Sequence, residues 1–169
     1  LNSGGEVYDC RFSDGMEKRS TMHNRVQSDF FIPAGGRPET INESNWQLFL
    51  NQPGVLSSKA IIEGANLYLT STARDLLGRA GCLIFKDSSA NKCGVITSSL
   101  EICANILLTE IEFLEIKADY VEEVLAKLKN LALAEVRLLL KEFSKSNRLS
   151  LPELSLEISN AIILLSDQL

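Results

Sequence analysis

Residues 59–85 read KAIIEGANLYLTSTARDLLGRAGCLIF, which is two short apolar runs with a helical pattern between them. The runs, residues 59–63 and 82–85, are apolar rather than alternating, which is typical of strands buried on both faces of a sheet. Hydroxyl residues at 70–72 can cap a helix with one apolar face, and Gly81 can end that helix in a left-handed conformation. This order predicts a βαβ unit with parallel strands and a right-handed crossover.

The same pattern extends to both sides of this unit. A strand is expected at residues 29–32, before the turn sequence PAGGRP, and a helix at residues 43–50 with Asn42 as its cap. A further helix is expected from Val95 to about Phe113. Together these elements predict an α/β fold, specifically part of a Rossmann-like three-layer domain with a parallel sheet, over residues 28–115.

Beyond residue 115 the apolar residues recur only at helical spacing. One helix is expected to open near Asp119 and to run to about Phe143, and a second to follow the capping sequence at Ser150 and Glu153. We therefore expect an all-helical segment at residues 116–169, whose apolar stripes form core or subunit interface.

Composition sets broad limits on the class of protein. The 169 residues are 45% hydrophobic and 23% charged, with a net charge of -5, so nucleic acid and anionic membranes have no electrostatic support as partners. Residues 1–27 form a polar lead-in, with a possible hairpin and without the pattern of a signal peptide. The four cysteines form no C-x-x-C pair, which favours reduced thiols in a cytoplasm, and the single histidine, His23, cannot build a multi-histidine metal site.

Each predicted strand is followed by small and polar residues: Ala34-Gly35-Gly36-Arg37, then Glu63-Gly64-Ala65-Asn66, then residues 87–94. In a parallel sheet the carboxyl ends of the strands line the crevice where ligands bind. Small residues let a ligand approach the backbone, and asparagine amides could hold a flat ring that carries an amide. Glycine and asparagine are also the usual turn formers after strands, and turns explain this pattern at least as well.

The loop after the third strand carries the most candidate ligand groups. Gly94 precedes the expected helix, whose first turn would hold Thr97, Ser98 and Ser99, and a helix start with hydroxyls can bind a carboxylate or a phosphate. Asp87 could orient a ligand or a partner loop, although a capping or turn role explains an isolated aspartate better. No G-x-G-x-x-G or P-loop motif follows any strand in the sequence.

Three ordered motifs, together with the residues that follow the third, resemble a known family. Residues 31–42, 62–67, 86–95 and 97–101 are similar to the carboxyl-side half of the coenzyme domain of glutamate dehydrogenases, in the Glu/Leu/Phe/Val dehydrogenase superfamily. The resemblance covers about residues 15–110 and is closest to the large NAD-specific class, in which the G-G-R-P and E-G-A-N-L sequences recur.

The resemblance implies NAD as the cofactor and assigns roles to individual residues. It places Asn66 and Asn91 at the nicotinamide end of the coenzyme and Ser98 against the amino-acid substrate. The full set of implied cofactor-binding residues is Ala34, Gly35, Gly64, Ala65, Asn66 and Asn91. The family motif has two glycines where this chain has Cys93-Gly94, so we expect a backbone at Cys93 that tolerates a side chain.

The implied reaction is oxidative deamination of L-glutamate to 2-oxoglutarate and ammonia, with hydride transfer to NAD. The family's catalytic lysine and aspartate belong to a separate substrate domain, so the chain is expected to be a fragment that is inactive alone. Its expected partners are the rest of the same polypeptide and further copies in a homo-oligomer. Two alternatives stay open: a branched or aromatic amino acid as substrate, or a non-catalytic nucleotide-binding or assembly module.

Overall fold

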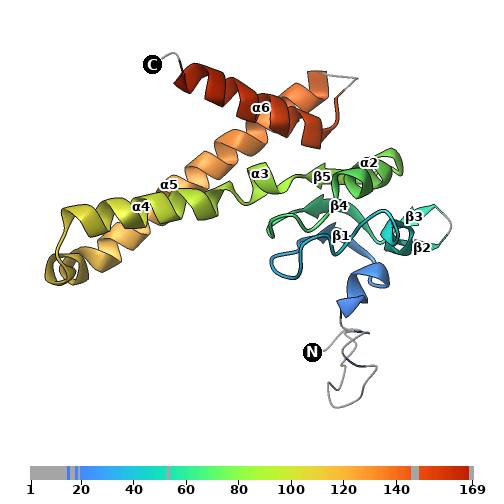
Figure 1. The fold of residues 1–169 in the computed structure, drawn as a ribbon, viewed down its shortest axis with the longest axis horizontal. Helices are drawn as coiled ribbons and strands as arrows, with labels where there is room; N and C mark the ends of the chain where they lie inside the picture. Colours follow the sequence, from blue (N-terminus) through green and yellow to red (C-terminus); the bar gives the residue numbers. More distant parts are fainter. Residues whose placement is uncertain (1–14, 16–17, 19, 53, 146–148, 168–169) are drawn as a thin grey trace.

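A computed structural model describes residues 15, 18, 20–52, 54–145 and 149–167, starting with a short 3-10 helix η1 (Met22–Asn24). The hairpin considered near the amino end of the chain lies outside these residues. Three strands form a parallel sheet in the order β1-β4-β5, as the sequence pattern predicts (Figure 1). Their bounds are β1 (Ser28–Phe31), β4 (Ser58–Ile62) and β5 (Leu83–Phe85).

Helix α2 (Ser71–Arg79) connects β4 to β5 and covers one face of the sheet. The Thr70 side chain caps it by accepting a hydrogen bond from the Ala73 N–H, and Gly81 follows it with a φ of +94°, so both predicted helix signals are confirmed. The main core lies between α2 and the sheet. It consists of Ile41, Phe49, Ile61, Tyr68, Leu69, Ala73, Leu77, Cys82 and Ile84.

The helix expected at residues 43–50 is wrong. The chain forms a one-turn 3-10 helix, η2 (Trp46–Phe49), and then the antiparallel hairpin β2 (Leu50–Gln52) and β3 (Val55–Leu56). The Asn42 side chain accepts a hydrogen bond from the Ser44 N–H at 3.0 Å, and the Asn45 side chain accepts one from the Asn42 N–H at 2.8 Å. Such local side-chain bonds offer the backbone an alternative to a regular helix.

Two further helix boundaries differ from the expected ones. Helix α4 (Lys92–Leu107) follows the short helix α3 (Asp87–Ala90), so it begins before Val95 and ends before Phe113. Helix α5 (Glu110–Lys145) begins well before Asp119 and continues without interruption through residue 115. Thr109 and Glu112 form its start, since the Thr109 N–H donates to the Glu112 carboxylate at 2.8 Å. The domain division at residue 115 stays a prediction.

The carboxyl-terminal helix α6 (Leu151–Ser166) opens with the predicted capping box at Ser150 and Glu153. Leu139, Leu151 and Leu154 form a second apolar cluster against Phe85, and neighbouring strand residues point to opposite faces, so α5 and α6 lie across the sheet from α2 at β5. This gives the three layers that the sequence predicts, with α4 and α5 extending away side by side (Figure 1). Within the described residues, no helix combines the length and the apolar character that a membrane span requires.

Candidate functional site

The loops after β1 and β4 contact each other at the carboxyl edge of the sheet. The Ala65 N–H donates a hydrogen bond of 2.7 Å to the Pro33 carbonyl. A Cβ atom built on Gly64 would lie 3.2 Å from the Pro33 carbonyl oxygen and 3.6 Å from the Ala34 Cα atom. A glycine at position 64 therefore permits the close approach of the two backbones. Gly35 lies at the same turn, where an added Cβ would meet open space.

The loops after β4 and β5 are joined by two asparagine side chains. The Asn91 amide nitrogen donates a hydrogen bond of 2.8 Å to the Asn66 amide oxygen. Among the described residues, nothing pairs with the other half of either amide, so the pair offers one donor and one acceptor to a ligand. A carboxamide carries the complementary acceptor and donor. The strand-end residues Ala34, Gly64, Ala65, Asn66 and Asn91 are thus brought together along one edge, while Ser98 lies further along α4.

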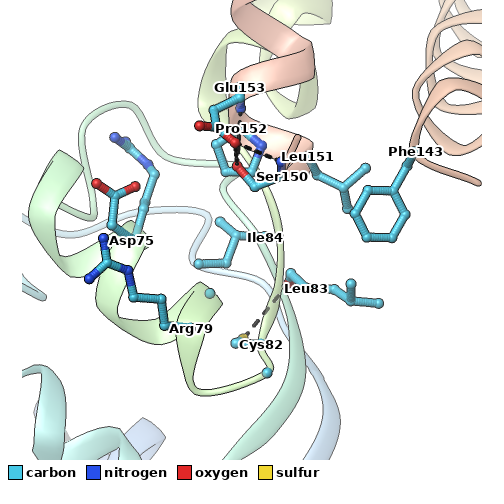
Figure 2. A pocket seen from close by; sticks show the side chains of 13 residues that line it. Asp75, Arg79, Cys82, Leu83, Ile84, Phe143, Ser150, Leu151, Pro152 and Glu153 are labelled. Carbon is cyan, nitrogen blue, oxygen red and sulfur yellow. Dashed lines mark hydrogen bonds between the residues drawn. The ribbon is translucent and has the colours of Figure 1, made fainter. Parts of the chain in front are cut away.

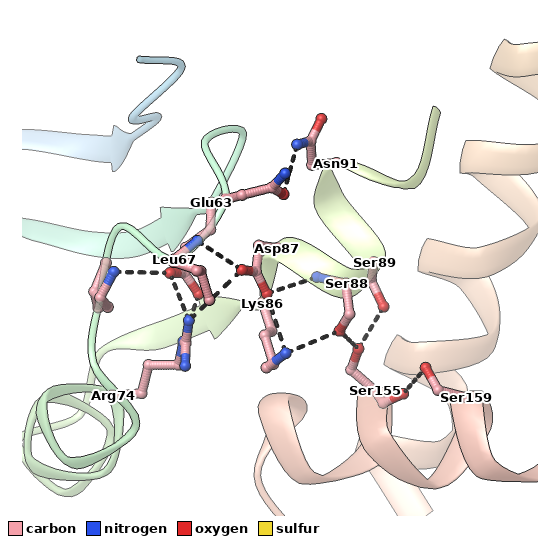
Figure 3. A network of polar contacts seen from close by, with 12 residues as sticks. Glu63, Leu67, Arg74, Lys86, Asp87, Ser88, Ser89, Asn91, Ser155 and Ser159 are labelled. Carbon is pink, nitrogen blue, oxygen red and sulfur yellow. Dashed lines mark hydrogen bonds and ion pairs between the residues drawn. The ribbon is translucent and has the colours of Figure 1, made fainter. Parts of the chain in front are cut away.

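A buried ionic network lies directly beneath these loops (Figure 3). The Arg74 guanidinium of α2 bonds both oxygens of the Glu63 carboxylate, at 2.7 and 3.1 Å, and lies 3.9 Å from the Asp87 carboxylate. The side chains of Glu63, Arg74 and Asp87 are 0%, 8% and 8% exposed. The sequence pattern places Glu63 and Asp87 among the strand-end residues, but it predicts neither their ionic contacts nor the part played by Arg74. The available signals were a charged residue, Glu63, at the end of an apolar strand and an arginine, Arg74, beside Ala73 on the apolar face of α2.

Asp87 is the first residue of α3 and not its cap, since Lys86 holds the N-cap position and makes no side-chain cap hydrogen bond. The Asp87 carboxylate accepts hydrogen bonds from the Leu67 N–H at 2.8 Å, the Ser88 N–H at 2.8 Å and the Lys86 ammonium at 3.1 Å. Burial raises the pKa of the Asp87 carboxyl, but the bonds from Leu67 and Lys86 and the charges of Lys86 and Arg74 outweigh it, so that pKa lies below its ordinary value. Asp87 is therefore a fixed anion that ties loop 64–67 to α3.

The prediction that hydroxyl side chains lie in the first turn of this helix is wrong, because α4 begins at Lys92. Thr97, Ser98 and Ser99 lie in its second turn, and each hydroxyl donates to the carbonyl four residues earlier, at 2.8, 3.2 and 3.1 Å. These hydroxyls do not accompany free N–H groups. Ser98 is exposed and lines a cavity of about 580 Å³ at the α4–α5 elbow, with Asn105 among its neighbours. Its role as a substrate contact stays a prediction.

Cys93 lies inside α4, where the backbone is helical, and its thiol is 3.8 Å from the Leu128 carbonyl of α5. Among the described residues, the side-chain-bearing residues with a positive φ are Glu39 and Leu67. The expectation that the backbone at Cys93 tolerates a side chain is confirmed. The cysteine faces α5.

A second cavity, of about 590 Å³, is lined by none of the residues predicted to bind coenzyme or substrate (Figure 2). It lies at the amino end of β5, between the carboxyl end of α2 and the amino end of α6, and its lining includes Arg79, Cys82, Phe143 and Pro152. Cys82 precedes β5, whereas the asparagine pair follows β4 and β5. This cavity opens at the amino end of β5, whereas the candidate site lies at the carboxyl ends of β4 and β5.

Comparison with known proteins shows the family of this chain. The family model described as Glutamate/Leucine/Phenylalanine/Valine dehydrogenase matches residues 4–146. The chain belongs to this dehydrogenase family. It is similar to a probable NAD-specific glutamate dehydrogenase of Schizosaccharomyces pombe, with 35% identity over 86% of this chain and 14% of the relative.

Two further glutamate dehydrogenases are similar to this chain and are also much longer than it. An NAD-specific glutamate dehydrogenase of Neurospora crassa is 35% identical over 92% of this chain and 16% of its own length. Glutamate dehydrogenase 2 of Dictyostelium discoideum is 41% identical over 59% of this chain and 10% of its own length. The chain thus spans about a tenth to a sixth of the length of these curated relatives.

Proposed function

We propose that this segment forms the nicotinamide side of the coenzyme site in an NAD-dependent glutamate dehydrogenase. The observation that carries the proposal is the hydrogen bond between Asn66 and Asn91, which leaves an amide donor and an amide acceptor side by side at the strand ends. The nicotinamide ring bears a carboxamide that can bond to both. The NAD-specific relatives support this choice of cofactor.

NAD, when bound, supplies the hydride acceptor for oxidation of the glutamate α-carbon. The task of this chain is to bind and orient. Ala65 and the turn at Ala34 and Gly35 let a flat group approach the backbone, because their side chains are small or absent, and Gly64 lets the two loops lie close together. The two amides then fix the rotation of the carboxamide, and with it the face that the ring presents to the substrate. Ser98 would contact the amino acid.

The residues that transfer protons belong, by the family resemblance, to another part of the parent protein. We therefore propose that the 169 residues alone do not catalyse the oxidation of glutamate. The rest of the same polypeptide would supply the substrate domain. The cytoplasmic location expected from the cysteines stays a prediction.

Asn91→Ala in the full-length protein tests the coenzyme site. Loss of one amide removes one hydrogen bond to the ring and the bond that holds Asn66, so we expect the KM for NAD to rise about tenfold and kcat to fall. Asn130→Ala on the exposed surface of α5 is the matched control and should leave both constants unchanged. Unchanged kinetics in Asn91→Ala would contradict the proposal and favour the non-catalytic nucleotide-binding or assembly module.

The substrate is the second point to test. The relatives named as glutamate dehydrogenases support L-glutamate and 2-oxoglutarate. Initial rates of the parent enzyme with glutamate, leucine, valine and phenylalanine separate this proposal from the alternative of a branched or aromatic substrate. A higher kcat/KM with leucine, valine or phenylalanine than with glutamate would identify that amino acid as the substrate.

We also propose that the parent is a homo-oligomer. Large apolar side chains are exposed along α4 and α5, which is unusual for a surface that stays in water. They include Val95, Ile102, Ile106, Leu107, Ile111 and Leu114. Light scattering on the full-length protein gives the subunit number directly, and a monomeric mass at micromolar concentration would contradict the proposal.

A further inference from the structure

The buried network of Glu63, Arg74 and Asp87 joins the two segments that carry the asparagine pair. Glu63 is followed directly by Gly64, Ala65 and Asn66, and Asp87 precedes Asn91 by one helical turn. Arg74 comes from a third element, helix α2, and its guanidinium lies between the two carboxylates (Figure 3). The network is therefore placed where it can set the spacing of the two loops.

Asp87 bonds to both segments that carry the asparagine pair. Its carboxylate accepts the Leu67 N–H at 2.8 Å, one residue after Asn66, and its backbone carbonyl accepts the Asn91 N–H at 2.8 Å. Leu67 has a φ of +57°, an uncommon conformation for a residue with a side chain, which the bond to Asp87 helps to hold. Movement of the Asp87 carboxylate would thus shift Asn66 relative to Asn91.

Arg74 helps to hold that carboxylate in place by its charge, together with the Lys86 ammonium, which bonds to it at 3.1 Å. Glu63 and Asp87 are both buried carboxylates, and two such anions repel each other unless a cation lies between them. The guanidinium is planar and presents several donors at fixed angles, so it can bond both Glu63 oxygens and still face Asp87. A lysine would keep the charge, but it could not reproduce this fork.

We propose that Arg74 is a positioning residue for the coenzyme site: by bridging Glu63 and Asp87 it sets the distance and orientation between Asn66 and Asn91. This inference rests on the proposed coenzyme role of the two asparagines. Arg74 itself does not contact the ligand. Its contribution to coenzyme binding passes through the asparagine pair.

A double-mutant cycle in the full-length protein tests this route. Arg74→Lys alone should raise the KM for NAD about tenfold, because the two amides lose their mutual alignment. In the Asn91→Ala background the same change should raise the KM less than about twofold, since the pair is already broken. The matched control is Arg79→Lys, on the exposed carboxyl end of the same helix, which should leave the KM for NAD and the coupling unchanged.

A purely structural role gives a different result. In that case Arg74→Lys lowers the fraction of folded enzyme, so kcat per total protein falls while the KM for NAD stays constant. Equal effects of Arg74→Lys in both backgrounds, or a change in kcat alone, overturn the inference. If Arg74→Lys fails to fold, as judged by circular dichroism, Asp87→Asn carries the same cycle, because asparagine keeps the size and one acceptor of Asp87.

Hydrogen exchange on the coenzyme-free protein separates this inference from the proposed function. Arg74→Lys should speed exchange in peptides that contain Leu67 and Asn91. If both peptides exchange as slowly in Arg74→Lys as in the unmodified protein, the positioning role is overturned, even if Asn91→Ala impairs NAD binding. Fast exchange with normal NAD kinetics in Asn91→Ala means that Arg74 orders the loops, while the proposed coenzyme role fails.

Discussion

Ser155 of α6 shares a hydrogen bond of 2.6 Å with Ser89 of α3, across 66 residues of sequence. The Ser155 hydroxyl also meets Ser88 at 2.8 Å, and the Ser155 side chain is almost fully buried. Helix α3 carries Asp87 and ends at Asn91, so this contact attaches the helical tail to the segment that bears the candidate site (Figure 3). Helix α6 therefore helps to hold α3 in place at the carboxyl edge of the sheet.

Replacement of Ser155 by alanine should loosen this attachment. The change removes the shared bonds to Ser88 and Ser89 and leaves their half-buried hydroxyls beside a methyl group, which costs about 1 kcal/mol. We expect a lower Tm of the full-length protein and faster hydrogen exchange in peptides covering residues 87–91. Ser166→Ala, at the exposed end of the same helix, is the control. Equal exchange in the two variants would show that the serine contact does not hold α3.

Replacement of Gly64 by alanine should separate the loops after β1 and β4. The new Cβ would lie 3.2 Å from the Pro33 carbonyl oxygen, so one backbone must shift by a few tenths of an ångström. Overpacking of this kind costs about 1 kcal/mol, and we expect the Ala65 amide, which bonds to Pro33, to exchange faster. Gly78→Ala, whose Cβ would meet open space on α2, should not destabilise the protein. A Tm for Gly64→Ala at or above that of Gly78→Ala would contradict the prediction.

Cys82 should be unreactive in the folded protein. Burial raises the pKa of its thiol to about 12, outweighing the opposite effect of a backbone hydrogen bond with Ile61, so almost no thiolate is present at pH 8. Iodoacetamide at pH 8, followed by peptide mass spectrometry, should modify the exposed Cys103 and spare Cys82. In urea both should be modified. Native-state labelling of Cys82 as fast as that of Cys103 would refute this assignment.

The Asp87 carboxylate should make stability depend on acid pH. Its pKa in the folded protein lies below the ordinary value of 3.8, so the unfolded chain binds the proton first as pH falls. The stabilisation is therefore complete above that ordinary value and is lost as pH falls through the lower folded pKa. Thermal unfolding of Asp87→Asn between pH 6 and pH 3 should show a smaller fall in Tm than the unmodified protein.

Other acidic side chains contribute to the same acid range, and a matched control isolates Asp87. The pKa of the exposed Asp29 carboxyl is also lowered, by a hydrogen bond and the charge of Lys59. Asp29→Asn should change the slope less, because solvent screens this exposed pair. Equal slopes for Asp87→Asn and the unmodified protein would mean that the buried network does not bind Asp87 in its charged form.

Much of the fold follows from local sequence. The three strands, the Thr70 and Ser150 caps and the left-handed Gly81 all lie where the pattern predicts them. The residues that meet at the candidate site could be predicted as well, because the carboxyl ends of parallel strands share one edge and Asn66 and Asn91 each follow a strand.

The boundaries of several helices could not be predicted in this way. At residues 43–50 the helical pattern competes with local bonds from Asn42 and Asn45, and burial of Phe49 in the main core accompanies the 3-10 form. Helix α4 begins three residues before Val95, the start that the pattern predicts, and Ser98 therefore lies beyond the first turn. Spacing alone does not resolve such competition, because its outcome depends on packing with distant segments.

The sequence by itself determined the order of the elements, the direction of the strands and the edge on which Asn66 and Asn91 gather, since these depend on short-range periodicity and chain direction. Only the tertiary structure decided that Arg74 bridges Glu63 and Asp87 and that Ser155 bonds to α3. These contacts join residues far apart in the chain, and a buried charge or hydroxyl finds its partner only when separate elements pack together.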